Sequence, residues 1–233
     1  MRSEIAWLVV CGAGCGRAHF EEQRFPAACP SDPRLTACYT FAGDARDHSG
    51  YSNDATVSNV RFVSDFDGQA VETTDTSRLD IVTPVLPREI YSIDAWIRPG
   101  RFDIEQIIFD YDQHWALYLD SRGRVGCRIN ASQTPVSFQV ATIGEWLHVA
   151  CVYDGSVLQV FVAGQAEGSD PQSPPPPEIG AAAIAGNAPV GQAGPAPFVG
   201  RLDRLRIWNA ALTESETCAA ADDCSLPRRN SSP

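Results

Sequence analysis

Apolar and polar residues alternate along much of the chain, most clearly between Gly144 and Val162. Apolar side chains recur at every second position on both sides of Asp154 and Gly155, a dipeptide typical of hairpin turns. A second alternating segment spans 200–207 and is followed by a short polar stretch. These patterns predict antiparallel strands that each bury one face, as in a β-sandwich.

Further short strands are expected in the middle of the chain, because several segments there are rich in β-branched and aromatic residues. They cover residues 92–98, 106–110, 115–120 and 123–129. Helices should be few and short, since no long segment has a helical period; Thr213 and Glu216 would cap one within 211–220. Residues 165–197 are rich in Ser, Gly and Pro and predict a surface loop, from which 179–184 returns to a sheet as one strand.

Length and charge limit the classes of protein to consider. A chain of 233 residues suits one all-β domain. Its formal net charge of −11 argues against nucleic acid and anionic membranes as partners, because a negative surface repels phosphates. Cations are the more compatible ligands.

The N-terminus resembles an export signal. An apolar run at 5–10 is too short to span a bilayer but suits a secretory signal over 1–14. Small residues before Cys15 resemble a lipoprotein processing site, in which Cys15 would carry the lipid. The protein is therefore expected to be an outer-membrane or cell-surface lipoprotein, or a secreted protein, that touches a membrane only through this anchor. A cytosolic chain with a different start is the alternative.

The remaining chain divides into a tether at 15–34, a folded domain at 35–217 and a tail at 218–233. With Cys15 set aside as the lipid carrier, six cysteines lie beyond the signal, an even number that suits an oxidising compartment. The pairs expected from their positions are Cys127–Cys151, Cys29–Cys38 and Cys218–Cys224. The first pair assumes that the two strands are neighbours in one sheet, with Cα atoms about 4.5 to 5.5 Å apart. Buried free thiols are the alternative.

Four motifs occur in an order that resembles a known family. They are the turn 47–55, the Trp-Ile-Arg-Pro segment at 96–99, the hairpin 146–155 and the closing strand 200–207. Over residues 35–217 the chain resembles the laminin-G-like and pentraxin-like domains of the concanavalin A-like lectin and glucanase superfamily. The resemblance implies an all-β, two-sheet antiparallel jelly-roll sandwich with few short helices.

The resemblance also implies a function. We expect an exported, non-catalytic binding module that recognises a glycan or an extracellular protein through its loops. The alternatives are a structural or assembly component of the cell envelope and a glycoside hydrolase or lyase. For the enzyme, the nearest approach to the required carboxylates on alternate strand positions is 101–105, where Arg101 replaces the first of the three acids.

Members of this family often hold calcium near the start of the domain and the closing strand, and calcium prefers carboxylate and amide oxygens. The candidate ligands are Asp203, Asp44, Asp47 and Asn53. Asp203 stands out because it interrupts an alternating strand, on the face expected to carry Leu205. The alternative is that Asp47 and Asn53 form Asx turns and that Asp203 pairs with an arginine.

Three aromatic residues are candidates for stacking on a sugar ring. They are Tyr51, Tyr111 and Trp115, which are expected to be exposed. The alternative is that each covers the edge of a sheet.

Overall fold

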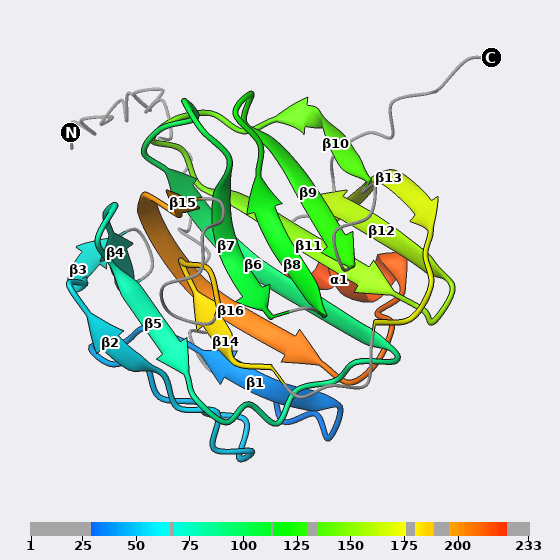
Figure 1. Ribbon diagram of the computed structural model, residues 1–233, viewed down its shortest axis with the longest axis horizontal. Helices are drawn as coiled ribbons and strands as arrows, with labels where there is room; N and C mark the ends of the chain where they lie inside the picture. The colour runs from blue at the N-terminus through cyan, green and yellow to red at the C-terminus, as the bar shows by residue number, and fades with distance from the viewer. Residues whose placement is uncertain are drawn as a thin grey trace, which may run out of the picture.

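The computed structural model describes residues 29–65, 68–112, 114–129, 135–175, 180–188 and 196–222. Within these ranges, sixteen strands form two sheets that lie one over the other, and one short helix covers part of the outer side (Figure 1). All strand pairs are antiparallel except one pair of two residues. The all-β, two-sheet antiparallel sandwich expected from the sequence is thereby confirmed.

Sheet A has the spatial order β13 (Gln165–Pro171), β12 (Val157–Val162), β11 (Leu147–Tyr153), β6 (Tyr91–Pro99), β16 (Gly200–Trp208), β4 (Gly68–Thr73) and β3 (Arg61–Asp65), and β1 (Leu35–Tyr39) also pairs with β16. Sheet B has the order β10 (Val136–Val140), β9 (Arg124–Ile129), β8 (Trp115–Leu119), β7 (Gln106–Tyr111), β14 (Ala182–Ile184), β5 (Arg78–Ile81) and β2 (Thr56–Ser58), and β15 (Ala196–Pro197) runs parallel to β7. The helix α1 comprises Glu214–Ala220.

The strands follow the hydrophobic pattern wherever one face is buried. The hairpin of β11 and β12 is confirmed, and Asp154 stabilises its turn by accepting hydrogen bonds from the backbone of Ser156 and Val157 at 2.8 Å. The predicted return strand is β14. Residues 165–171 were expected to be loop but form β13, because this edge strand is mostly polar and needs no buried apolar face.

The disulfide Cys127–Cys151 is present, but the geometry assumed for it was wrong. Cys127 lies in β9 of sheet B and Cys151 in β11 of sheet A, so the bond crosses between the sheets. Stacked sheets are usually about 10 Å apart, whereas these two Cα atoms are 5.7 Å apart. The bond therefore holds the two sheets together where both cysteines are buried.

The part of the expected tether that is described, residues 29–34, packs onto the domain. Cys29 is bonded to Cys38 of β1 as predicted, and Arg34 forms an ion pair with Glu216 of α1 at 2.9 Å. The predicted capping box of α1 is also confirmed, since Thr213 and Glu216 exchange hydrogen bonds. Cys218 is disulfide-bonded, while its expected partner Cys224, Cys15 and the signal at 1–14 lie outside the described residues.

An ion pair between the fully buried Asp94 and the mostly buried Arg206 lies on the outer side of sheet A, the side turned away from sheet B. Asp94 of β6 accepts hydrogen bonds from the guanidinium of Arg206 at 2.8 and 2.5 Å and from the indole N–H of Trp208 at 2.8 Å. The His148 ring nitrogen Nε2 lies 3.3 Å from the same carboxylate. Arg206 also donates to the carbonyl of Ala220 in α1, so the ion pair connects the sheet to the helix.

Protonation of these groups follows from their burial. Burial alone would raise the pKa of the Asp94 carboxyl, but the charge of Arg206 and the hydrogen bonds from His148 and Trp208 outweigh it and hold the pKa below its usual value. Burial lowers the pKa of His148, so this imidazole is neutral near pH 7. Asp94 therefore carries its charge inside the protein and depends on Arg206 to balance it.

Replacing Asp94 by alanine is expected to destabilise the fold by about 3–5 kcal/mol, because the Arg206 charge would remain buried without a partner. The measurement is chemical denaturation of the purified protein. Asp32→Ala is the matched control, since Asp32 pairs with Arg34 at the surface and should change stability little. Similar small effects for both variants would contradict the importance of the Asp94 cluster.

Candidate functional site

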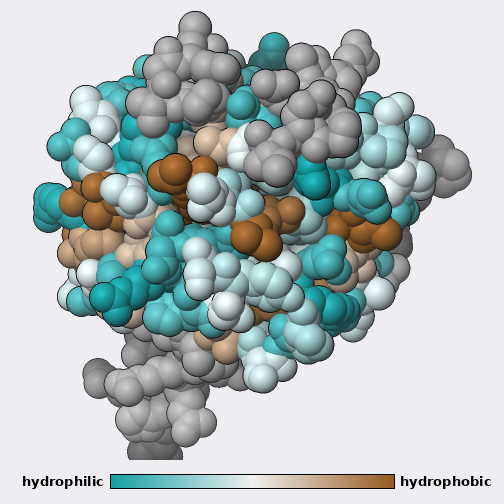
Figure 2. All heavy atoms as spheres, turned by 60° about the horizontal axis from the view of Figure 1, so that its bottom comes forward, coloured by the Kyte–Doolittle hydropathy of each residue, from teal (hydrophilic) through white to brown (hydrophobic). Residues whose placement is uncertain are grey.

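Two loops meet at one edge of the sandwich, which we name the loop edge. It comprises residues 40–55, which follow β1, and residues 82–90, which follow β5. Both loops run along the bottom of Figure 1. Figure 2 turns this side toward the viewer and shows several separate apolar areas among polar atoms.

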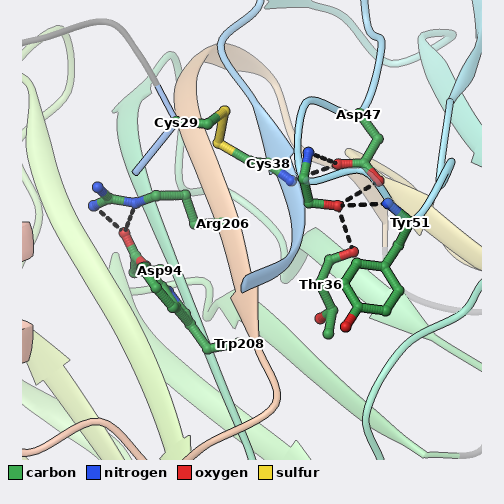
Figure 3. The surroundings of a disulfide bond; sticks show 9 residues. Cys29, Thr36, Cys38, Asp47, Tyr51, Asp94, Arg206 and Trp208 are labelled. Atoms are coloured by element: carbon green, nitrogen blue, oxygen red, sulfur yellow. Dashed lines mark hydrogen bonds and ion pairs between the residues drawn. A yellow bond between two sulfur atoms is a disulfide. The ribbon is translucent and has the colours of Figure 1, made fainter. Parts of the chain in front are cut away.

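Asp47 organises the first loop (Figure 3). Its Oδ1 accepts hydrogen bonds from the backbone of Cys38 at 2.9 Å and of Ser49 at 2.8 Å. Its Oδ2 accepts from the Ser49 hydroxyl at 2.7 Å and from the backbone of Asn53 at 2.9 Å. Four donors thus surround one carboxylate, which fixes the turn in place, as expected for an Asx-type turn.

The same loop is held to the sheet by a covalent bond. Cys38, whose N–H binds Asp47, is also bonded to Cys29, and its side chain lies on the outer side of sheet A. In the sheet, Cys38 is paired with Arg206, which in turn is paired with Asp94. Figure 3 shows the disulfide between the Asp47 turn and the Asp94–Arg206 ion pair.

Asn53 joins the two loops. Its buried side-chain amide donates to the carbonyls of Thr36 at 2.8 Å and Val85 at 3.3 Å, and its Oδ1 accepts from the backbone N–H of Val85 at 2.7 Å. The Tyr39 hydroxyl also donates to the Asn53 carbonyl. One side chain therefore ties the strand β1 and both loops together, although Val85 is 32 residues away in sequence.

The second loop has two further anchors. Leu86 is buried in the core of the sandwich, and the indole of Trp115 donates a hydrogen bond to the Pro87 carbonyl at 3.1 Å. Because these groups fix the backbone directly after Val85, and Asn53 binds Val85 itself, this part of the loop is ordered before any ligand arrives. Ordered loops bind without a large loss of conformational entropy.

The exposed side chains at this edge are mixed: Arg46, His48, Ser52, Asp54, Thr83 and Glu89 are polar or charged, and the larger apolar ones are Tyr51, Val82, Val85 and Ile90. Val82 is 74% exposed, Val85 57% and Tyr51 45%. The polar side chains of Asp47, Ser49 and Asn53 are occupied by bonds within the protein. The loop edge can therefore contact a ligand through an aromatic ring and two aliphatic side chains on a fixed backbone.

Of the three aromatic residues expected to be exposed, the structure leaves only Tyr51 accessible. Tyr111 and Trp115 are each 2% exposed, so that expectation was wrong for both. Trp115 stacks between Tyr91 and Phe109, with ring centroids 4.4 and 5.0 Å away, inside the core. The alternation of β8 turns Trp115 inward, which its isolated position in the sequence does not reveal.

The four candidate calcium ligands do not assemble into one group. In the part of the chain that the structure describes, no cluster of three or more His, Cys, Asp or Glu residues is suited to a metal. Asp44 is exposed and lies near Arg46, whereas Asp47 and Asn53 are surrounded by donors of the protein itself. These contacts fit the alternative of a hydrogen-bonded turn, and calcium binding stays a prediction.

Asp203 lies on the side of β16 opposite to the one expected. Arg204 has a left-handed backbone with φ of 46°, and the pairing of β16 with β6 is irregular at this point. The bulge inserts an extra residue, so Leu205 faces the core while Asp203 pairs in register with Trp96. The Arg204 guanidinium approaches the Asp203 carboxylate to 3.5 Å.

The carboxylate arrangement of the enzyme alternative is not formed at 101–105. These residues precede β7 and are not in a strand, so their side chains do not alternate onto one face. Asp103 is largely exposed beside Arg101, and Glu105 binds Arg128 at 2.6 Å. Each of these acids is thus paired with an arginine.

The sequence offered only a weak signal for the second loop. Residues 82–90 contain two prolines around an apolar pair, which indicates an extended loop with one anchoring side chain. Its contact with Asn53 depends on the folding of both sheets. That contact could not be read from local pattern.

Comparison with known proteins agrees with this architecture. The family model of the concanavalin A-like lectin/glucanases superfamily matches residues 67–218, more than half of the chain, and the chain belongs to this family. No curated protein matches.

Among solved structures, domain 4 of AbnA, an extracellular arabinanase from Geobacillus stearothermophilus solved with arabinotriose, has a TM-score of 0.68 at 22% identity. The alignment covers 81% of this chain and 98% of that one. The binding domain of Paraclostridial Mosquitocidal Protein 1 has a TM-score of 0.64 at 16% identity. That alignment covers 81% of this chain and 52% of the other. A Ruminococcus gnavus sialidase CBM40 bound to sialyllactose has a TM-score of 0.50 at 17% identity. That alignment covers 58% of this chain and 83% of the other. At these identities the likeness concerns the fold.

Within the described residues, no helix has the length and apolar character that a membrane span requires. The disulfides Cys29–Cys38 and Cys127–Cys151 are compatible with an extracellular domain, because such bonds persist in oxidising compartments.

Replacing Asn53 by alanine is expected to loosen the loop edge, because the Val85 N–H would lose its partner, a loss of about 1–3 kcal/mol for a group left unsatisfied. The Thr36 carbonyl would keep its hydrogen bond from the Ser49 hydroxyl at 2.9 Å. Hydrogen exchange of the Val85 amide should accelerate more than exchange in β12. Asn209→Ala, at an exposed position, is the matched control. Unchanged protection of Val85 would show that Asn53 does not join the loops.

Proposed function

We propose that this protein is an exported, non-catalytic binding module that recognises a glycan or a protein through the loop edge. The observation that carries the proposal is the fixed backbone around Val85 and Tyr51, with their side chains exposed to solvent. Rigid scaffolds commonly carry their binding residues on such loops.

The relatives support a binding role over catalysis. One structural neighbour is a binding domain of a toxin, and two others were solved with the oligosaccharides arabinotriose and sialyllactose. Export follows from the signal proposed at 1–14, with Cys15 as the proposed lipid carrier. A structural component of the cell envelope is the second candidate, since an anchored domain with exposed apolar side chains such as Val82 and Val85 is also suited to a permanent partner.

The first test is a screen of the purified protein against an oligosaccharide array that includes arabinan and sialylated glycans. Tyr51→Ala and Val85→Ser should weaken any captured interaction by about tenfold or more, because small groups of exposed anchors dominate binding. The melting temperature should stay close to that of the wild type, since both side chains are exposed.

Phe138→Ser is the matched control, because Phe138 is 85% exposed in β10, away from the loop edge. Loss of binding in this variant, with binding retained in Tyr51→Ala and Val85→Ser, would contradict the assignment of the loop edge. Repeating the screen with EDTA tests the calcium dependence implied by the resemblance. Turnover of a polysaccharide would overturn the non-catalytic assignment.

A further inference from the structure

Asp110 is a half-buried carboxylate on the outer side of sheet B, far in sequence from the loop edge. The residues paired with Asp110 on the two adjacent strands are Ala183 of β14 and Ala116 of β8. Both alanines are buried, and neither side chain can donate a hydrogen bond or balance a charge. The sheet around Asp110 therefore leaves its charge without compensation from adjacent strands.

The arginines nearest to Asp110 are already paired with other acids. On β5, Arg78 binds Asp80 through a hydrogen bond of 2.6 Å. On β9, Arg128 binds Glu105 at 2.6 Å. These carboxylates neutralise both guanidinium groups locally, and among the described residues Asp110 itself forms no ion pair.

The turn after β7 adds a further negative charge at Asp112, which disfavours ionisation of Asp110. The elements packed around Asp110 are thus β5, β8, β9, β14 and this turn. They also carry Arg124 of β9, which forms an ion pair with Asp120 at 2.7 Å, and the buried His114 of the turn, whose ring centroid lies 4.3 Å from that of Tyr111. The segment 185–188, which follows β14, contributes no titratable side chain.

This segment lies over Asp110. The backbone N–H of Ala188 donates to the Asp110 carboxylate at 2.7 Å, and the Asn187 carbonyl accepts from Arg78 at 2.8 Å. At its start, Ala185 donates to the carbonyl of Ile108 at 2.8 Å. Ala185 and Ala188 are buried, so the segment covers this part of the sheet and is fastened there by Asp110 and Arg78.

We propose that Asp110 makes segment 185–188 a pH-sensitive cover, which is closed over sheet B when the carboxyl is protonated and loosened when it is ionised. An ionised carboxylate requires solvation, and water reaches Asp110 more fully when the segment lifts. Protonation of Asp110 removes the need for solvation, while the carbonyl oxygen of the protonated carboxyl group still accepts the hydrogen bond from the Ala188 N–H.

The direction of the effect follows from the acid–base equilibrium. Burial raises the pKa of Asp110 from 3.8 to about 6, against the opposing effects of the Ala188 hydrogen bond and the arginine charges. Because the pKa is raised in the closed form, the stabilisation of that form is complete below about pH 4 and is lost as the pH rises through about 6.

Hydrogen exchange of the amides of 186–188 tests the proposal on the intact protein. After correction for the intrinsic pH dependence of exchange, their opening equilibrium should increase between about pH 4 and pH 7, by at most roughly fifty-fold, the increase that results when opening returns the pKa of Asp110 fully to 3.8. Amides of β12 should not follow this increase. An equal increase throughout the protein would indicate global destabilisation and overturn the proposal, as would a flat response at 186–188.

Two variants and one control test whether Asp110 causes the pH dependence of opening at 185–188. Asp110→Asn keeps an oxygen that accepts from Ala188 but cannot ionise, so its opening equilibrium should not change with pH. Asp80→Asn releases Arg78 to balance Asp110 and should move the transition to lower pH. Asp103→Asn, at an exposed acid, should behave as the wild type. An unchanged pH response in Asp110→Asn, or an unmoved transition in Asp80→Asn, would overturn the assignment to Asp110.

Discussion

Asp94 carries a negative charge in a fully buried position, and this charge must be balanced by Arg206 for the outer side of sheet A to form. The row of paired residues that contains both groups continues to Cys38, where β1 joins the sheet. Cys38 in turn fixes Asp47 through its backbone and Cys29 through its sulfur. A buried ion pair is thus connected, through one row of a sheet, to the loops that carry the proposed binding residues.

The two acidic residues Asp47 and Asp110 show how the same chemical group takes on different properties in one protein. Asp47 accepts four hydrogen bonds and serves as the centre of a rigid turn. Asp110 is flanked by alanines, and its pKa is raised by burial. The environment provided by neighbouring strands decides whether a carboxylate stabilises a loop or makes its closure depend on pH.

The family relationship explains why the sandwich resembles those of binding domains that differ widely in sequence. Alternating strands specify two stacked sheets, and many different side chains satisfy that requirement. The connections between strands are less constrained, and they carry the exposed residues Tyr51, Val82 and Val85 here. Under the proposed function, ligand choice would therefore depend on loops that the shared architecture does not specify.

The sequence by itself determined the hairpin of β11 and β12 and the capping box of α1, because alternation, turn chemistry and caps are encoded within a few neighbouring residues. Tertiary structure alone decided that Trp115 is buried, that Asp203 faces away from the core and that Asn53 reaches Val85. The polar edge strand β13 was likewise missed, since its pattern needs no apolar face. These features depend on which strands pair and where a bulge changes the register, and pairing joins residues that are distant in sequence.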